Sequence, residues 1–314
     1  MRQACLNMVY ELAKSDPRVV FIGSDLSPNL LSEMKRQMPT RHYMEGVMEQ
    51  YVIGMAAGMA MDGLMPYVNT IATFITRRCY EQVALDLCLQ NLPVRLIGNG
   101  GGLVYAPLGP THLAVEDFAI MRALPNMTVT AVADAEEMQR LMRATLDWPH
   151  PIYIRLGKGG DPVISDEAHG FAIGKGIVMR PAAGYGHVLL VACGVMTQRA
   201  LAAADLLEAN GRAVEVIHIH TVKPLDEELI LARAAVADSV FVIEEHTVIG
   251  GLGSAVVDLL VEQGGPRLPI FRKLGLADRF AQHYGSQDQL LEINGLLPTQ
   301  IAASVETVLH ATSG

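Results

Sequence analysis

The sequence lacks the features that mark secreted, membrane and nucleic-acid-binding proteins. Its four cysteines form no Cys-x-x-Cys pair, so neither a disulfide framework nor a cysteine metal site is expected. There is no apolar run of 18 residues and no apolar signal core at the N-terminus, which argues against membrane spanning and secretion. The net charge is −9 and basic clusters are no longer than the pair Arg77-Arg78, which argues against nucleic acid and anionic membranes as partners. We expect a cytoplasmic protein.

Several catalytic motifs are also missing. The sequence contains no His-x-x-x-His and no Gly-x-Ser-x-Gly, so neither a protein-bound metal nor a serine nucleophile is expected. Gly251 and Gly253 begin a candidate dinucleotide fingerprint, but Val256 stands where that motif needs Gly or Ala. The run Glu244-Glu245-His246 contains metal-ligand residue types. Because adjacent strand residues point to opposite faces, we do not expect these three to converge on one ion.

What the sequence does contain is a regular alternation of apolar strands and helices. Half of the residues are hydrophobic, which is enough for a full core, and the alternation predicts mostly parallel sheets covered on both faces. We therefore predict an α/β protein with two doubly wound domains, at 1–158 and 187–314, joined by a linker over 159–186. The expected strands cover 19–23, 65–68, 94–98, 127–131, 151–156, 188–193, 213–219, 239–244 and 269–274. The expected helices cover 2–14, the segment after Glu49, 77–90, a segment from 114, 134–147, 197–210, 226–237, 254–263 and 299–309.

Glu49 is an acid at the start of an otherwise apolar helix. Ile53, Ala56 and Ala57 follow it at helical spacing, so we expect the carboxyl group on or beside the buried face. A buried carboxylate is costly unless it has a partner, and such an acid can donate or share a proton. Alternatively, Glu49 only interacts with the positive end of the helix. Gly54 and Gly58 lower helix stability and are tolerable if another backbone packs closely there.

The second candidate feature is a glycine-rich loop at 99–112 that follows a predicted strand. In open parallel sheets, ligands bind outside the carboxyl ends of the strands. Three successive glycines, beginning at Gly100, allow positive φ and close approach of the backbone to a ligand. His112 can exchange protons near neutral pH. The alternatives are an ordinary surface loop and a structural histidine.

Seven motifs in order resemble the pyrimidine-binding and C-terminal domains of transketolases. The likeness covers nearly the whole chain and includes the sequence Gly109-Pro110-Thr111-His112. Each motif is weak alone, whereas their shared order is specific. The motifs lie at 45–58, 73–82, 109–112, 122–127, 153–157, 222–226 and 244–253.

The resemblance implies that thiamine diphosphate is the cofactor. In that family, the glutamate matching Glu49 hydrogen-bonds a nitrogen of the aminopyrimidine ring and shares a proton with it. The aromatic residue matching Phe74 packs on that ring, and Tyr80 and Gln50 are assigned to the same pocket. His112 matches a histidine near the reacting carbons, so Glu49 and His112 are the expected catalytic residues.

The resemblance also implies substrate-binding positions, some of which depart from the family. Arg155 and Arg2 match arginines that hold the phosphate of a sugar phosphate. Gly100 stands where transketolases have a histidine, and Asn29 stands where they have a serine. Gly101 replaces an arginine of deoxyxylulose-phosphate synthases. Leu108 replaces an aspartate of both groups. We therefore expect a less polar, modified or shorter acceptor.

Transketolases bind the diphosphate and Mg²⁺ through a Gly-Asp-Gly motif, which this sequence lacks. The resemblance therefore implies the second subunit of a split transketolase. An α subunit would then supply the diphosphate and metal site, in an α₂β₂ assembly, and the Gly54/Gly58 face is a candidate interface. The expected reaction is transfer of a two-carbon ketol unit from a ketose to an aldehyde. The alternatives are a decarboxylating relative, either deoxyxylulose-phosphate-synthase-like or a 2-oxoacid dehydrogenase β-subunit, and a non-catalytic scaffold subunit.

Overall fold

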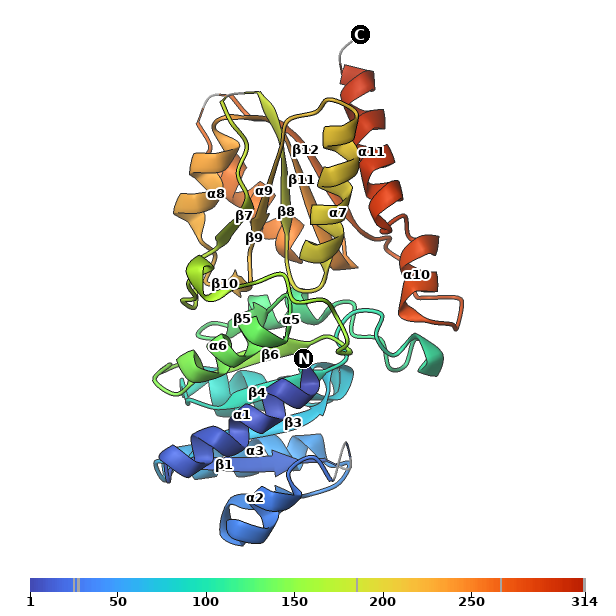
Figure 1. Cartoon of the computed structure of the whole chain (residues 1–314). Helices are drawn as coiled ribbons and strands as arrows, with labels where there is room; N and C mark the ends of the chain where they lie inside the picture. Colours follow the sequence, from blue (N-terminus) through green and yellow to red (C-terminus); the bar gives the residue numbers. More distant parts are fainter. Residues whose placement is uncertain (25, 27–28, 185, 266, 313–314) are drawn as a thin grey trace.

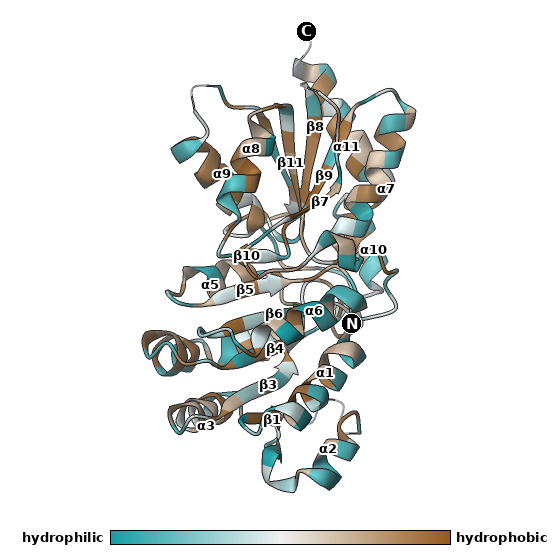
Figure 2. Ribbon diagram, turned by 60° about the vertical axis from the view of Figure 1, so that its left-hand side comes forward, coloured by the Kyte–Doolittle hydropathy of each residue, from teal (hydrophilic) through white to brown (hydrophobic). Residues whose placement is uncertain are grey.

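Each half of the chain forms a mostly parallel β-sheet with helices on both faces, as the alternating pattern predicts (Figures 1 and 2). The computed structural model describes residues 1–24, 26, 29–184, 186–265 and 267–312. The two sheets are stacked along the long axis of the molecule, with the N-terminus near the junction and the C-terminus at the far end of the second half.

The first sheet has seven strands among the described residues, in the order β10-β5-β6-β4-β3-β1-β2. All neighbouring strands are parallel except β10, which runs antiparallel to β5. The strands are β1 (Val19–Gly23), β2 (His42–Met44), β3 (Met65–Ile71), β4 (Arg95–Asn99), β5 (Thr128–Ala131), β6 (Ile152–Leu156) and β10 (Thr221–Lys223).

Within the part of the chain that the structure describes, the second sheet has five strands in the order β12-β11-β8-β9-β7. Its edge strand β7 is antiparallel to β9, and the other pairs are parallel. The strands are β7 (Ile177–Arg180), β8 (His187–Ala192), β9 (Val214–His218), β11 (Ala237–Thr247) and β12 (Ile270–Leu276).

The helices cover both faces of each sheet (Figure 2). On the first sheet, α1 (Arg2–Ser15) and α6 (Ala135–Thr145) pack on one face, and α3 (Glu49–Met61), η3 (Val83–Leu89) and α5 (Asp117–Ala123) pack on the other. On the second sheet, α7 (Met196–Ala209) and α11 (Pro298–Thr312) lie opposite α8 (Glu227–Ala234) and α9 (Leu252–Gln263). The shorter helices are α2 (Ser32–Gln37), η1 (Pro39–Arg41), η2 (Phe74–Arg78), α4 (Tyr80–Gln82), η4 (Ala106–Leu108), η5 (Glu167–His169) and α10 (Gln287–Ile293).

Most predicted strands and helices are confirmed, and the exceptions have local causes. The helix predicted from residue 114 begins at Asp117, because the carbonyl of Ala114 accepts hydrogen bonds from the Gly102 amide and from Arg155. The helix predicted over 77–90 begins earlier, at Phe74, and includes the two π-helical segments η2 and η3. The predicted linker contains β7, and β10 from the second half completes the first sheet. The domain boundaries stay predictions.

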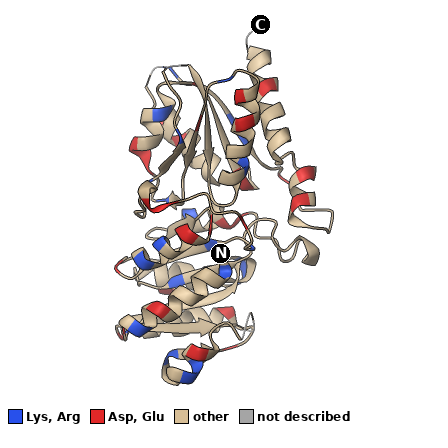
Figure 3. Cartoon of the chain, in the orientation of Figure 1, with Lys and Arg blue, Asp and Glu red and all other residues tan. Residues whose placement is uncertain are grey.

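Acidic and basic residues are interspersed along both halves of the chain (Figure 3). All four cysteines are free and buried. Burial raises the pKa of the Cys5, Cys79 and Cys88 thiols to about 12, so these thiols are protonated at neutral pH. Among the described residues, no helix is long and apolar enough to cross a membrane.

Candidate functional site

Glu49 is the first residue of α3 and its side chain is buried, with 3% of its surface exposed. Ile53, Ala56 and Ala57 lie on the same buried face, as predicted. The carboxylate is satisfied by a residue that the sequence did not single out: Arg78 Nη1 donates to Glu49 Oε2 at 2.8 Å. Glu49 is not the N-cap residue of the helix; that position belongs to Met48. The acid is therefore fixed in the first turn by a partner from η2.

Phe74 and His112 lie side by side next to this ion pair. Their ring centroids are 5.3 Å apart in an edge-on arrangement, and the Arg78 guanidinium lies 4.1 Å from the Phe74 centroid. The same residues line a wide cleft of about 860 Å³. The cleft also contains Thr73, whose buried hydroxyl has no hydrogen-bond partner among the described residues. Arg78 thus contacts both Glu49 and Phe74, and Phe74 in turn contacts His112.

A small cavity of about 10 Å³ lies beside Glu49. It is lined by the ends of β1 and β3, including Ser24, Asn69 and Thr70. The Nδ2 atom of Asn69 is buried and has no partner among the described residues, while its Oδ1 accepts from Asn99 at 2.5 Å. Buried polar atoms without partners are uncommon in folded proteins. Asn69, in the cavity beside Glu49, and Thr73, in the cleft beside Phe74, are therefore candidate ligand contacts.

The glycine-rich loop has the positive φ angles that the sequence predicts, with +71° at Gly100 and +65° at Gly102. Its glycines are also needed for packing within the chain. A Cβ atom on Gly101 would lie 2.1 Å from Arg155 Nε, and one on Gly100 would lie 2.2 Å from the Tyr105 ring. At both positions, where the sequence has glycine instead of the histidine or arginine of the family, a side chain would overlap Tyr105 or Arg155 of this chain.

A second cavity, of about 240 Å³, brings Arg2 and Gly100 together. Tyr105 and Lys158 line it as well. Burial raises the pKa of the Tyr105 phenol although the cation of Arg2 lies close by. The sequence did not single out Lys158, and its place on the loop after β6 is the only signal that could have indicated it. The two cations make this cavity suitable for an anionic group.

Four predicted site residues lie elsewhere. The hydroxyl of Tyr80 donates to the carbonyl of Ile120 at 2.9 Å, on α5. Gln50 follows Glu49 but is exposed, as is Asn29 in the loop after β1. Arg155 is buried and lines a cavity at the ends of β5 and β6, beside Cys193 and Glu245, rather than the His112 cleft. Their assigned roles stay predictions.

Arg155 is held by groups of its own chain. Its Nε lies 3.1 Å from Asp117 Oδ2, and its Nη2 donates to the carbonyls of Ala114 and Glu245 at 3.1 and 2.8 Å. The guanidinium also lies 4.3 Å from the centroid of Phe118. Burial raises the pKa of Asp117 although Arg155 opposes the shift. These contacts join the glycine-rich loop, α5 and β11, so Arg155 links the two halves of the chain.

Side chains of β11, in the second domain, accept hydrogen bonds from the glycine-rich loop and from α5. Glu245 Oε1 accepts from the Leu103 amide at 2.9 Å, and His246 Nε2 accepts from the Ala119 amide at 3.2 Å. Glu244 instead accepts from the Leu252 and Gly253 amides at 2.7 and 2.9 Å, at the start of α9. Glu244 Oε2 and His246 Nδ1 lie 3.7 Å apart, whereas Glu245 points to the glycine-rich loop, so the three side chains do not converge on one point.

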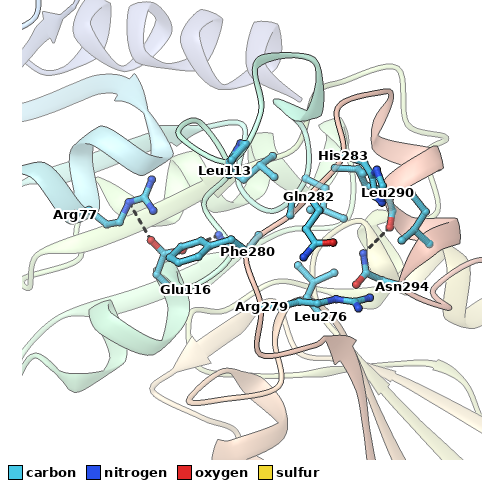
Figure 4. A pocket seen from close by; sticks show the side chains of 15 residues that line it. Arg77, Leu113, Glu116, Leu276, Arg279, Phe280, Gln282, His283, Leu290 and Asn294 are labelled. Atoms are coloured by element: carbon cyan, nitrogen blue, oxygen red, sulfur yellow. Dashed lines mark hydrogen bonds and ion pairs between the residues drawn. The ribbon is translucent and has the colours of Figure 1, made fainter.

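A further cavity, of about 90 Å³, lies between the His112 loop and the segment after β12 (Figure 4). Arg77 and Phe280 line both this cavity and the His112 cleft. Arg77 Nε pairs with Glu116 Oε1 at 3.1 Å, and Phe280 is 79% exposed. Phe280 thus forms a wall shared by two neighbouring spaces. The apolar lining of the smaller cavity includes Leu103, Leu113, Leu276 and Leu290.

These features define a class of protein: two stacked α/β domains with a buried acid beside a cleft that a half-buried aromatic ring and a histidine line. The family model "Transketolase, pyrimidine binding domain" matches residues 1–160, and "Transketolase, C-terminal domain" matches residues 179–301. The chain therefore belongs to the transketolase family.

Similar proteins include chains of comparable length and longer enzymes that this chain matches in part. An uncharacterised transketolase family protein, y4mN, of Sinorhizobium fredii is 37% identical over 94% of this chain and 85% of its own length. The 6-deoxy-6-sulfo-D-fructose transketolase subunit SqwH of a Clostridium species is 34% identical over 98% and 94%. The 1-deoxy-D-xylulose-5-phosphate synthase of Heliobacterium modesticaldum is 35% identical over 96% of this chain but 46% of its own length. The chain thus spans about half of that synthase.

A solved structure shares the entire architecture. It is described as "Split gene transketolase, inactive beta4 tetramer" and is 35% identical in sequence, with a TM-score of 0.89. The similarity covers 98% of each chain. The structural relationship therefore includes both domains and their arrangement.

Proposed function

We propose that this chain is the β-type subunit of a split, thiamine-diphosphate-dependent transketolase. It would transfer a two-carbon ketol unit from a ketose or ketose phosphate to an aldehyde. The observation that carries the proposal is the buried carboxylate of Glu49. It pairs with Arg78, which stacks on Phe74, and Phe74 contacts His112. Thiamine diphosphate supplies the carbanion chemistry of this reaction, and the protein supplies binding, orientation and proton control.

The residues present fit the pyrimidine half of this cofactor. Glu49 offers a buried carboxylate to a ring nitrogen from the small cavity beside it, and Phe74 offers an aromatic face in the neighbouring cleft that Arg78 also lines. The buried Thr73 hydroxyl and Asn69 amide have no partners among the described residues, so each has capacity for a hydrogen bond to a ligand. In this proposal Glu49 holds the proton shared with the ring, and His112 donates to or accepts from a substrate hydroxyl.

The substrate's anionic end fits the cavity lined by Arg2, Lys158 and Tyr105. Two cations and a phenol can bind a phosphate or a sulfonate group, and Gly100 lets the backbone approach. We assign Arg155 to the junction of the two domains, because Asp117 already holds its guanidinium.

The proposal requires an α subunit that carries the diphosphate and Mg²⁺ or another divalent cation, in an α₂β₂ assembly. An exposed apolar face on α3 and η3 supports such a partner. Tyr51 is 55% exposed and Leu89 is 70% exposed, and these helices pack against each other. A Cβ on Gly58 would meet nothing within 4 Å of this chain, so the glycines leave room for a close approach by another subunit. The related beta4 structure is described as a tetramer.

The decisive variant is Glu49→Gln, assayed in the complex with the co-expressed diphosphate-binding chain. We expect ketol transfer to fall by roughly 10²–10⁴, while gel filtration still shows the complex. Donors would include ketose phosphates and 6-deoxy-6-sulfofructose. The control Glu33→Gln removes an exposed acid of α2 and should retain full activity. Full activity of Glu49→Gln would instead support the scaffold alternative.

A decarboxylating activity is the second candidate, because a deoxyxylulose-phosphate synthase is similar over 96% of this chain. The two reactions differ in their products. Release of CO₂ from a 2-oxoacid such as pyruvate, without ketol transfer, would favour this second reaction.

A further inference from the structure

The guanidinium of Arg78 makes both of the contacts that the proposed function assigns to an aminopyrimidine ring. It donates to Glu49 Oε2 at 2.8 Å and stacks 4.1 Å from the centroid of Phe74. Phe74 and Arg78 are the first and last residues of η2, and their four-residue spacing places the two side chains on one side of the helix. One planar cation therefore bridges the acid and the aromatic face.

A guanidinium and an aminopyrimidine share the features that this site recognises. Both are flat, both present in-plane N–H groups that a carboxylate can accept, and both stack on an aromatic ring. We propose that Arg78 is a stand-in ligand, which occupies Glu49 and Phe74 before the cofactor binds and leaves them when the pyrimidine enters. This inference rests on the proposed function and concerns how Glu49 and Phe74 are held in position before the cofactor binds.

The structure identifies Arg78 as the movable member of the pair. The Glu49 side chain is buried and fixed in the first turn of α3, whereas the Arg78 side chain is 37% exposed at the edge of an open cleft. The neighbouring Arg77 is held by Glu116 at 3.1 Å and by the carbonyl of Thr111 at 3.3 Å. Arg78 can therefore turn toward solvent without disturbing α3 or the His112 loop.

The contacts of Arg78 stabilise the empty pocket but lower its affinity for the cofactor. A buried carboxylate without a partner is costly, so Arg78 keeps Glu49 and Phe74 in place while the cofactor is absent. Cofactor binding must then break one ion pair and one stacking contact. Arg78 is thus a positioning residue whose removal strengthens cofactor binding. A merely structural role predicts the opposite sign, because loss of Arg78 would deform the pocket.

The test measures cofactor affinity of Arg78→Gln in the complex with the diphosphate-binding chain, with thiamine diphosphate and Mg²⁺ as the probe. We expect calorimetry to show a dissociation constant roughly three- to tenfold lower than that of the wild type. The cofactor should also raise the melting temperature of the variant by more than that of the wild type. Arg36→Gln is the matched control, because it removes an exposed arginine of α2 that pairs with Glu33.

Unchanged or weaker binding by Arg78→Gln, with normal binding by the wild type and Arg36→Gln, overturns this inference and leaves the proposed function intact. A wild-type complex that takes up no thiamine diphosphate overturns both. If Arg78→Gln does not fold, Arg78→Lys replaces it. This variant keeps the charge but loses the planar stack, so a dissociation constant between those expected for wild type and Arg78→Gln supports the inference, and weaker binding contradicts it.

Discussion

At the scale of single residues, the shape of the glycine-rich loop depends on what lies directly beneath it. Gly101 contacts the Arg155 side chain, and Gly102 lies so close to Glu245 that a Cβ would approach its carboxyl carbon to 2.5 Å. Arg155 and Glu245 are themselves buried and held by hydrogen bonds from other elements. The glycine segment of the loop can therefore keep its position without help from a ligand.

Gly101→Ala tests this packing directly. The added methyl group would overlap Arg155 Nε, which is fixed by Asp117. Overpacking of this kind costs about 1–3 kcal/mol, so we expect a lower midpoint in urea unfolding. We also expect weaker binding of anionic substrates, because the neighbouring Gly100 lines their cavity. A variant with wild-type stability would show that Arg155 can yield and that the loop is not rigidly supported.

The sequence indicated some of these residues and could not indicate others. The burial of Glu49 follows from its helical spacing to small apolar residues. Arg78 was not recognised, because two adjacent arginines look like an exposed basic face until the fold places one of them against Glu49. Arg155 was assigned to phosphate binding on its motif alone, and its contact with Asp117, 38 positions away in the chain, depends on how β6 and α5 pack.

At the scale of secondary structure, one face of α3 is buried at the candidate site and the opposite face is exposed to a partner subunit in the proposed assembly. The buried face carries Glu49, and the opposite face carries Tyr51 and both helix glycines. We expect Gly58→Ala to stabilise the chain alone by up to about 1 kcal/mol, since Ala is the better helix former and the added Cβ meets no other group. The same change should weaken association with the partner subunit.

Two measurements separate these effects. Urea unfolding of the isolated chain reports the helix, and the dissociation constant of the complex reports the interface. Gly58→Ala is also a control for Gly101→Ala, because it adds the same methyl group at a position where no other atom of the chain lies within 4 Å. Unchanged association would place the partner on a different face.

Two short edge strands, β10 and β7, are among the elements that the sequence did not predict, together with β2, α2 and α10. The residues of β10 include Thr221 and Lys223, which gave no apolar run, and β7 lies among glycines and prolines at 170–186. Both strands are antiparallel to the neighbour that they join. Their pairing depends on the existing edge of a sheet rather than on a pattern in their own residues, so only the folded neighbours could reveal them.

At the scale of the whole molecule, buried histidines lie at the junction of the two halves. His218 Nε2 lies 2.9 Å from Glu137 Oε2 on α6, and His246 stacks on Phe118 of α5 with centroids 5.2 Å apart. His220 stacks on Phe171 at 4.3 Å, and its Nε2 has no partner among the described residues. Burial, with the nearby His218, lowers the pKa of His220 to about 4.

This shift predicts acid sensitivity with a definite sign. Between pH 6.5 and 4 the unfolded chain binds a proton at His220 that the folded chain does not, so stability falls as the pH falls through this window. Between pH 7.5 and 5.5 the loss from His220 should be about 1 kcal/mol. His220→Phe keeps the stack with Phe171 and should remove this part of the slope. Equal slopes for the two proteins in urea unfolding would mean that His220 titrates normally.

The strand β10 limits how this polypeptide can be divided. Residues 221–223 close the edge of the first sheet at β5, so a chain cut after residue 186 would expose the backbone N–H and C=O groups of β5. Unprotected edges of this kind pair with other chains and promote aggregation. The first sheet therefore depends on a strand from the second half of the chain. Exchange of the second domain between relatives would succeed only if the incoming segment brought a strand that fits the recipient's sheet.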